Sequence, residues 1–438
     1  MDERLLTGTM RMNEANHLEI GGVDTVSLVE KYGTPVYVYD ISQIKYKART
    51  FKKAFQDRNI KAQVAYASKA FSCLAVYQLM AKEEMSLDVV SGGELFTAIQ
   101  AEYPNKKIHF HGNNKSDSEI IAALDYDIGC FVVDNFYELS KLNEYTKQRQ
   151  QKVSVLLRVT PGVEAHTHEY ITTGQTDSKF GFDLENGQAQ QALEMSLEMP
   201  YIDVMGLHCH IGSQIFETDG FSLAIDKLMI QSKEWQVLFD FQLRVLNVGG
   251  GFGIRYTSED EPLPIEDYVN NLIDEVQSVS EKIQLPMPEI WIEPGRSLVG
   301  DAGITLYQVG SQKLIPDVRN YLAIDGGMTD NIRPALYDAK YTGVLANRVA
   351  DAVEETYSIA GKCCESGDML IWDLPLPKAD ATDILAVFST GAYGYAMASN
   401  YNRIPRPPVV FVENGKDFLA IKRESYADLM RLDCSLYQ

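Results

Sequence analysis

Apolar runs recur along the first two thirds of the chain and alternate with stretches of helical periodicity. Near-continuous apolar runs are typical of strands covered on both faces of a parallel sheet. The pattern predicts eight such strands, at residues 62–70, 86–91, 107–113, 130–135, 153–160, 204–213, 244–251 and 289–296. Eight strands alternating with helices over this span favour an α/β fold with a closed (β/α)8 TIM-like barrel. An open, doubly wound sheet has the same alternation and is the alternative.

The pattern differs on both sides of this region. Before it, residues 34–39 alternate and are rich in β-formers, which predicts a strand, and Asp40 is placed to cap a helix over residues 41–55. After it, short β-like runs separated by turn signals predict a C-terminal all-β domain. Its strands are expected at residues 304–309, 321–325, 356–360, 369–372, 384–389, 409–413 and 418–422.

These changes of pattern predict two domains. The barrel is expected at residues 41–297, and residues 1–40 and 298–438 are expected to form the β-domain. The N-terminal strand could therefore pair into the sheet that the C-terminal part of the chain builds.

The charge balance limits the partners of the protein. Lys and Arg number 40 against 61 Asp and Glu, a formal net charge of −21, which argues against a nucleic-acid or anionic-membrane partner. The six cysteines show no metal-type Cys-x-x-Cys spacing. The sequence also shows no signal-like apolar run at its N-terminus and no long apolar span. We therefore expect a cytoplasmic protein with reduced thiols.

The first predicted barrel strand ends in Tyr66-Ala67-Ser68-Lys69. Functional groups of such barrels gather at the carboxyl ends of the strands. A lysine held there in an apolar cleft would be desolvated, which favours the free amine, and a free amine condenses with an aldehyde. The alternative is a lysine that simply reaches solvent beyond the strand.

Histidines follow several of the other predicted strands. His208 and His210 share one face of the sixth strand, so a flat imidazole there could stack on a planar cofactor. His-x-His pairs also occur at residues 109–111 and 166–168, and each of the three pairs could bind a metal. We expect no metal, because no carboxylate lies at ligand spacing beside His208 and His210.

Two further strand ends carry candidate contacts to an anion and to a cofactor. Gly249-Gly250-Gly251 follows the seventh strand, where the backbone N–H groups of a glycine turn can approach a phosphate; a flexible turn is the alternative. Glu293-Pro294-Gly295-Arg296 ends the eighth strand. A buried carboxylate beside an arginine is most often a structural ion pair. Glu293 could instead hydrogen-bond a protonated ring nitrogen of a cofactor, with Arg296 binding an anionic substrate group.

The β-domain contributes two candidate turns. Cys364-Glu365-Ser366-Gly367-Asp368 follows directly on Cys363. A lone pair of cysteines is usually buried as hydrophobic side chains, but the adjacent acidic residues make burial less favourable and indicate a polar, functional turn. Gly391-Ala392-Tyr393-Gly394 is either a β-turn with packed tyrosines or a phosphate contact through Tyr393.

Taken in order, these motifs resemble the fold-type III pyridoxal-phosphate-dependent decarboxylases, and among them those that act on diaminopimelate. The match covers the Lys69, His208–Ser213, glycine, Glu293–Arg296, Cys364–Asp368 and Tyr393 motifs, which run through nearly the whole chain. The resemblance implies pyridoxal 5'-phosphate as the cofactor and decarboxylation of meso-2,6-diaminopimelate to L-lysine and CO2. It also implies a head-to-tail homodimer whose active sites lie at the interface.

The resemblance further implies a role for each residue of the motifs. Lys69 would bind the cofactor aldehyde covalently, His208 would stack on the pyridine ring, and Glu293 would pair with the ring nitrogen. Cys364 of the partner subunit would donate a proton. The phosphate would be held by Ser213, Gly250, Gly251 and Tyr393, with the backbone of Glu293, Pro294, Gly295 and Arg296. The distal end of the substrate would be bound by Arg296, Arg333, Tyr337, Tyr393 and the partner's Glu365.

Other functions share part of this pattern. A related decarboxylase could act on ornithine, arginine, lysine or carboxynorspermidine, but Glu365 with Arg296 and Arg333 suits a substrate with a second amino-acid head. A non-catalytic homologue that binds the cofactor and regulates a partner would be expected to lack Lys69 or Cys364, and both are present. A single-barrel cofactor carrier would lack the β-domain.

Overall fold

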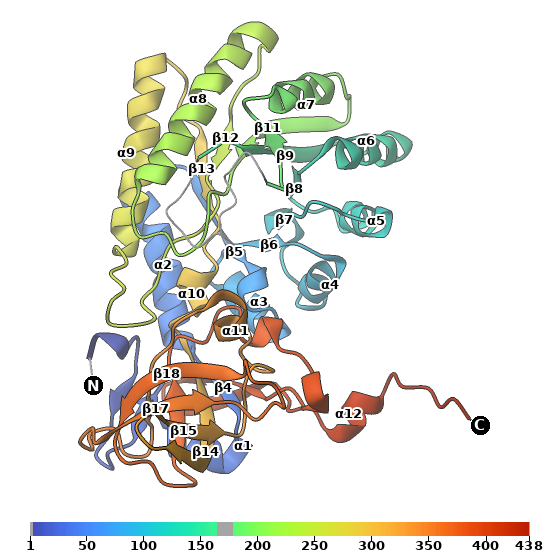
Figure 1. Ribbon diagram of the computed structural model, residues 1–438. Helices are drawn as coiled ribbons and strands as arrows, with labels where there is room; N and C mark the ends of the chain where they lie inside the picture. Colours follow the sequence, from blue (N-terminus) through green and yellow to red (C-terminus); the bar gives the residue numbers. More distant parts are fainter. Residues whose placement is uncertain (1–2, 164–177, 438) are drawn as a thin grey trace. The chain divides into compact units, whose positions relative to one another are not determined.

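The computed structural model describes residues 3–163 and 178–437, and its chain divides into two compact units (Figure 1). The barrel unit comprises Lys47–Gly253 and Pro262–Ser297, and the β-unit comprises Met1–Tyr46, Ile254–Glu261 and Leu298–Gln438. These limits differ from the expected domains at residues 41–46 and 254–261, which belong to the β-unit. The histidine pair at residues 166–168 lies outside the described residues.

The barrel unit contains all eight predicted strands, and they are parallel. They are β5 (Ala62–Ala67), β6 (Ser86–Val89), β7 (Ile108–Phe110), β8 (Cys130–Val133), β9 (Val153–Thr160), β11 (Ile202–His208), β12 (Val245–Asn247) and β13 (Glu289–Ile292). Each pairs with the next, β13 pairs back onto β5, and the short strand β10 (Phe182–Asp183) adds beside β9. The sheet is therefore a closed barrel, and the open-sheet alternative is wrong.

Most of the observed strands end earlier than the apolar runs that predicted them. The run at residues 204–213 yields a strand that stops at His208, and the run at residues 244–251 yields one that stops at Asn247. The polar and glycine residues after these points leave the sheet ladder. They form the loops at the carboxyl ends of the strands, where barrels carry their functional groups.

Helices connect the strands and cover the outside of the barrel (Figure 1). Side-chain caps start several of them directly after a strand. Ser91 accepts the N–H of Glu94, Ser116 forms a capping box with Glu119, and Asn135 accepts the N–H of Glu138. The helices are α3 (Leu74–Lys82), α4 (Gly92–Gln100), α5 (Asp117–Asp125), α6 (Phe136–Arg149), α7 (Gln188–Leu197), α8 (Asp219–Phe239), α9 (Ile265–Ile283) and α10 (Arg296–Val299).

The N-terminal strand and the helix after it form as predicted. Strand β4 (Val36–Asp40) is followed by α2 (Ile41–Asp57), and the Gln43 N–H donates to Oδ1 of Asp40 at 3.1 Å. Strand β4 lies in the β-unit between β14 (Gly303–Ile315), which is antiparallel to it, and β20 (Val409–Glu413), which is parallel. The expected pairing of this strand into the C-terminal sheet is thus confirmed.

The β-unit contains strands at all seven predicted runs and more besides. The remaining strands are β1 (Arg11–Met12), β2 (Leu18–Ile20), β3 (Val23–Asp24), β15 (Arg319–Ile324), β16 (Gly343–Leu345), β17 (Glu355–Ala360), β18 (Met369–Leu376), β19 (Ile384–Val387) and β21 (Lys416–Ile421). The short strand β16 was not predicted. Because the unit also holds α1 (Thr25–Tyr32), α11 (Arg333–Tyr337) and α12 (Tyr426–Met430), it is β-rich and not all-β.

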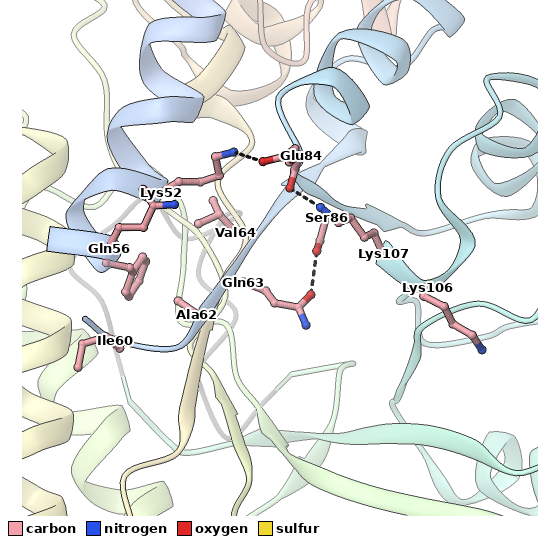
Figure 2. A pocket seen from close by; sticks show the side chains of 11 residues that line it. Lys52, Gln56, Ile60, Ala62, Gln63, Val64, Glu84, Ser86, Lys106 and Lys107 are labelled. Atoms are coloured by element: carbon pink, nitrogen blue, oxygen red, sulfur yellow. Dashed lines mark hydrogen bonds and ion pairs between the residues drawn. The ribbon is translucent and has the colours of Figure 1, made fainter. Parts of the chain in front are cut away.

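A pocket of about 250 Å³ lies at the amino ends of the barrel strands (Figure 2). Its lining includes Ala62 and Ser86, the first residues of β5 and β6, and Lys107 just before β7. It is therefore at the opposite strand ends from Lys69. Among the described residues, no helix is both long enough and apolar enough to cross a membrane.

Candidate active site at the carboxyl ends of the barrel strands

Lys69 lies directly beyond the first barrel strand, in a single turn of 3-10 helix, Ser68–Ala70. Its side chain is exposed. The charged groups that interact with it are the carboxylates of Asp88 and Glu94 and the imidazole of His210. The expected apolar cleft is therefore wrong. Lys69 occupies the predicted position, but polar neighbours surround it.

The two carboxylates that face Lys69 are held in place by the barrel. Oε2 of Glu94 accepts hydrogen bonds from the Ser68 hydroxyl at 2.9 Å and from the Val90 N–H at 2.7 Å. Burial raises the pKa of Glu94 above its usual value, and burial raises the pKa of Asp88 to about 6. Lys69 thus lies beside two carboxylates that hold a proton more tightly than exposed carboxylates do.

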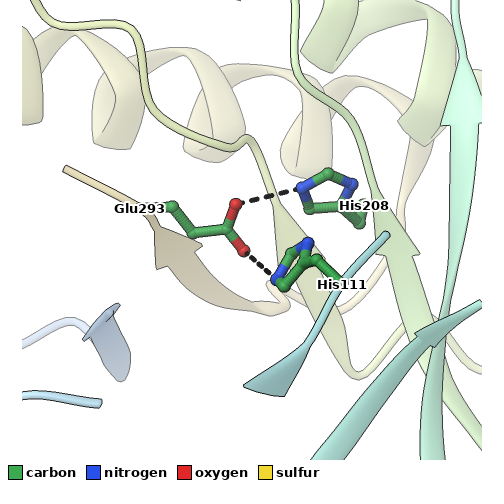
Figure 3. Close-up of side chains that lie close together, drawn as sticks. All are labelled: His111, His208 and Glu293. Carbon is green, nitrogen blue, oxygen red and sulfur yellow. Dashed lines mark hydrogen bonds and ion pairs between the residues drawn. The ribbon is translucent and has the colours of Figure 1, made fainter. Parts of the chain in front are cut away.

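Glu293 follows the last residue of β13 and is only 7% exposed. Oε1 of its carboxylate lies 3.0 Å from Nε2 of His111 and accepts a hydrogen bond from Nδ2 of Asn247 at 2.6 Å. Oε2 lies 3.1 Å from Nε2 of His208 (Figure 3). Groups from strands β7, β11 and β12 therefore converge on one carboxylate at the end of a fourth strand.

The charges around Glu293 favour its ionised form. Burial alone would raise the pKa of Glu293, but His111 and His208 outweigh burial and hold this pKa well below its usual range. Burial would likewise lower the pKa of His111, yet Asp88 and Glu293 raise it above the usual value. For His208, burial dominates and lowers the pKa to about 4. These shifts favour the protonated form of His111 beside an ionised Glu293, with a neutral His208 on the other oxygen.

The glycine turn after β12 packs directly against the backbone that carries Glu293. A side chain at Gly250 would place its Cβ 2.1 Å from the Glu293 carbonyl oxygen, a distance that no Cβ tolerates. Gly249 has a φ of 73°, in the left-handed region that favours glycine. The Gly250 N–H donates to Nδ1 of His210 at 3.3 Å. The predicted motifs at His210, the glycine turn and Glu293 are thus in mutual contact.

The residues after Glu293 join the last barrel strand to the first. The Ala67 N–H donates to the Pro294 carbonyl at 3.2 Å, and a Cβ at Gly295 would lie 3.0 Å from Cβ of Ala67. Arg296, which is 6% exposed, donates from Nη2 to the Ser213 hydroxyl at 2.9 Å. The guanidinium of Arg296 and the hydroxyl of Ser213 therefore lie at the same end of the barrel as Lys69.

The two histidines of the pair at residues 109–111 have different partners. The ring of His109 stacks on Trp291 with 4.4 Å between the centroids, whereas His111 reaches Glu293. Metal was not expected, because no carboxylate lies beside His208 in the sequence. That reason is wrong, because the closed barrel brings Glu293 within 3.1 Å of His208 from a distant part of the chain.

In the β-unit, the two adjacent cysteines have different environments. Cys363 is buried, and burial raises its pKa to about 11; Cys364 is exposed. The neighbouring Asp368 is buried and accepts the N–H groups of Cys363 at 2.7 Å and of Met328 at 2.6 Å. The acidic residues were expected to make burial of the cysteines less favourable, which holds for Cys364 but not for Cys363. Asp368 fixes the turn from within, and Cys364 and Glu365 are presented to solvent.

The predicted substrate contacts of the β-unit centre on Arg333. Its guanidinium is buried and donates from Nη1 to the hydroxyls of Tyr256 at 3.1 Å and Tyr341 at 2.5 Å. Within the described part of the chain, no carboxylate forms an ion pair with Arg333. A buried arginine whose described side-chain hydrogen bonds go to hydroxyls is suited to an incoming carboxylate. Tyr337 and Tyr393 are half-buried.

Three residues of this site received no role from the sequence. Asp88, Glu94 and Asn247 complete the surroundings of Lys69 and Glu293. Two of them carried a signal, since Asp88 is a charged residue inside the short strand β6 and Asn247 is a polar residue at the end of the apolar strand β12. Glu94 carried none, because an acidic residue in the first turn of a helix is common.

The chain is similar to known proteins over nearly its whole length. Residues 41–300 match the family described as pyridoxal-dependent decarboxylase, pyridoxal binding domain. The chain is 63% identical over 417 residues to diaminopimelate decarboxylase of Bacillus methanolicus, covering 95% of this chain and 96% of that protein. It is 61% identical over 428 residues to diaminopimelate decarboxylase of Bacillus subtilis (strain 168), covering 98% of each. The crystal structure of diaminopimelate decarboxylase from M. jannaschii in co-complex with L-lysine is similar with a TM-score of 0.92, at 38% identity and 98% coverage of each chain.

Proposed function

This chain belongs to the fold-type III pyridoxal-dependent decarboxylases, and from its similarity to their diaminopimelate-specific members we propose that it converts meso-2,6-diaminopimelate to L-lysine and CO2. The observation that carries the proposal is the buried carboxylate of Glu293, held ionised between His111 and His208 at the barrel end where Lys69 lies. A buried anion with this support is suited to pair with a protonated ring nitrogen.

The residues present fit pyridoxal 5'-phosphate. Lys69 offers an exposed amine for its aldehyde, and His208 offers a buried, neutral imidazole beside the ring position. The cation of Arg296 and the hydroxyl of Ser213 provide donors for a phosphate. Gly250 and Gly251 supply the close backbone approach that a phosphate site requires. Tyr393 completes the proposed set from the β-unit.

When bound, the cofactor supplies a protonated ring that accepts the electron pair left behind by the departing CO2. Glu293, whose pKa His111 and His208 hold well below its usual range, would accept a hydrogen bond from the ring nitrogen and favour its protonated form. His111 neutralises the charge of Glu293, and Asn247 fixes the orientation of the carboxylate through its 2.6 Å hydrogen bond. Lys69, whose amine would hold the cofactor, could exchange protons with the nearby Asp88 and Glu94.

We assign recognition of the distal amino-acid end of the substrate to cationic and anionic groups together. Arg333 has no described carboxylate partner and can take the distal carboxylate. Arg296, Tyr337 and Tyr393 are assigned to the same end of the substrate. Glu365 can take the distal ammonium. A site that needs both groups would reject amino acids that lack the second head, such as ornithine or lysine, because its own polar groups would be left unpaired.

The proposal includes a homodimer with shared active sites. Cys364 and Glu365 are exposed on a turn that Asp368 fixes from within, and the Cys364 N–H donates to Oδ1 of Asn402 at 2.8 Å. A rigid turn that presents a thiol and a carboxylate to solvent is suited to reach the Lys69 site of a partner subunit, where Cys364 would donate a proton to carbon. A cytoplasmic location belongs to the same proposal.

The test is to supply the purified protein, loaded with pyridoxal phosphate, with meso-diaminopimelate and to measure lysine and CO2. We expect both products in equal amounts. Ornithine, arginine, lysine and carboxynorspermidine serve as competing substrates, and we expect their kcat/KM to be lower by a factor of about 10⁴. Comparable turnover of any of these amines, or no CO2 from diaminopimelate, would contradict the proposal.

A further inference from the structure

The groups around Glu293 also form a donor set for a metal ion. Nε2 of His111, Nε2 of His208 and a carboxylate oxygen of Glu293 lie within 4.8 Å of one another, and all three residues are buried (Figure 3). They come from three different parts of the barrel, after β7, at the end of β11 and after β13. The barrel scaffold therefore holds them in place without any one loop having to fold around an ion.

Two of the separations are close to those of a tetrahedral zinc site. Bonds of about 2.0–2.2 Å to zinc place neighbouring donor atoms roughly 3.3–3.5 Å apart. Oε1 of Glu293 lies 3.0 Å from Nε2 of His111, and Oε2 lies 3.1 Å from Nε2 of His208. With one donor atom from each residue, the three donors lie within 4.8 Å of one another, so side-chain rotations would bring them around one ion. Two imidazoles with one carboxylate is also a set that zinc enzymes use, with the fourth position open.

The surroundings of the three donors support an ion as well. Asn247 donates to Oε1 of Glu293 at 2.6 Å and so orients the carboxylate. Asp88 lies 3.7 Å from Nε2 of His111 and brings a second carboxylate close to the ion. Neighbours that orient metal ligands and balance the charge typically strengthen binding. The two carboxylates would together balance the two charges of a zinc ion.

We propose that this protein, when it lacks pyridoxal phosphate, binds one divalent zinc-type cation at His111, His208 and Glu293, and that the cation and the cofactor exclude each other. The exclusion rests on the proposed function, in which Glu293 and His208 contact the cofactor ring. An ion bound to these side chains would take the lone pairs of Glu293 that the ring nitrogen needs. Any proton on His111 would pass to solvent as its nitrogen binds the ion.

The experiment uses the full-length protein in two forms, loaded with pyridoxal phosphate and stripped of it. Co²⁺ is the probe, because its visible absorption reports tetrahedral binding, and zinc is then titrated calorimetrically. We expect one ion per stripped chain and no binding to the loaded chain at the same concentrations. Zinc added first should slow the return of pyridoxal phosphate, followed by its visible absorption, by at least about tenfold, as for any tight competitor.

Variants locate the ion. His111→Gln and His208→Gln should each weaken Co²⁺ binding at least about tenfold. Glu293→Gln, which keeps the shape of the side chain, should do the same if either histidine variant fails to fold. The matched control is His17→Gln, which removes a histidine that pairs with Asp24 at 2.9 Å in the β-unit and should bind Co²⁺ like the wild type.

Three results would overturn the inference. They are no stoichiometric binding to the stripped protein, wild-type binding by the barrel variants, and simultaneous binding of Co²⁺ and pyridoxal phosphate. None of them depends on turnover of diaminopimelate. A protein that decarboxylates its substrate but binds no Co²⁺ when stripped would retain the proposed function and lose only this metal site.

Discussion

His111 and Glu293 form a buried ion pair, with 3.0 Å between Nε2 and Oε1, although they follow different strands of the barrel. His111 is in turn 3.7 Å from Asp88. Asp88 and Glu293 both raise the pKa of His111, and His111 together with His208 keeps the pKa of the buried Glu293 low. The roles of Glu293 and His111 both depend on this contact.

Glu293 should act on the chemical step and not on substrate binding. Glu293→Gln keeps the size of the side chain and removes its charge, so the ring nitrogen would lose the anion that holds its proton. We expect kcat to fall about 100-fold, the size of effect seen when one electrostatic contact to a transition state is removed. KM for diaminopimelate should change little. A rise in KM at unchanged kcat would show instead that Glu293 binds substrate.

His111 should set the pH range over which Glu293 works. In the wild type, His111 and His208 hold the pKa of Glu293 well below its usual range. His111→Gln can still donate a hydrogen bond but carries no charge, so burial would raise the pKa of Glu293. Because activity needs the ionised carboxylate, the acid limb of the pH profile of kcat should move to higher pH, with recovery at alkaline pH. His17→Gln is the control, and an unmoved acid limb would contradict this role.

Lys69 should be the lysine that carries the cofactor. Borohydride reduction of the loaded protein followed by peptide mapping is expected to find the label at Lys69. This residue has an exposed amine and lies directly beyond the carboxyl end of β5. Lys69→Ala should remove both the label and the visible absorption of the protein. Labelling of a different lysine would assign the site elsewhere.

Lys69 and Cys364 should serve one active site from two chains. Lys69→Ala and Cys364→Ala homodimers are each expected to be nearly inactive. When the two are refolded together, half of the dimers are mixed, and each mixed dimer has one intact site. Activity should recover to about a quarter of that of the wild type. Mixed dimers that form but remain inactive would mean that both residues serve the same chain.

Asp330 should make stability fall as pH rises. Burial raises the pKa of Asp330 from 3.8 to about 7. The folded state therefore holds the proton more tightly than the unfolded state, so stability is fully present below about pH 4 and is lost between there and about pH 7. At 1.36 kcal/mol per pKa unit, the loss is at most about 4 kcal/mol.

Asp330→Asn removes this titration but can still accept the Gly327 N–H, now bonded at 2.9 Å. Relative to wild type, the free energy of unfolding of the variant should therefore rise between pH 4 and pH 8, measured by denaturant titration. Asp428→Asn is the control of opposite sign, since hydrogen bonds from Ser425 lower the pKa of that exposed carboxyl. A wild-type pH dependence in Asp330→Asn would contradict the prediction.

The sequence predicted the elements well because strand signals here are local. All eight barrel strands arise from apolar runs, and the order of pairing follows from their parallel arrangement. Closure was less certain, since the contact between β13 and β5 joins residues far apart in the chain. The short strand β16 was not predicted, because three residues are too few to show the alternation of a strand.

The sequence motifs predicted which residues belong to the candidate site, but not which of them contact one another. His208 and Glu293 were assigned to the ends of the sixth and eighth strands, where the structure has them, but the sequence could not show that His111 and Asn247 meet the same carboxylate. The polar surroundings of Lys69 were missed for the same reason, since Asp88 and Glu94 reach it from the next strand and helix. Such contacts depend on the curvature of the barrel, which no local pattern encodes.

The place of β4 has a consequence for how the chain folds during synthesis. This strand leaves the ribosome early, yet its two neighbours are β14 and β20, and the second lies close to the C-terminus. The barrel strands, by contrast, are all available once β13 has been made. We therefore expect the barrel to close first. During most of translation, β4 would have no neighbouring strand to pair with. Strand β4 is thus made early but is among the last strands to be paired. While its apolar residues are exposed, aggregation would compete with folding.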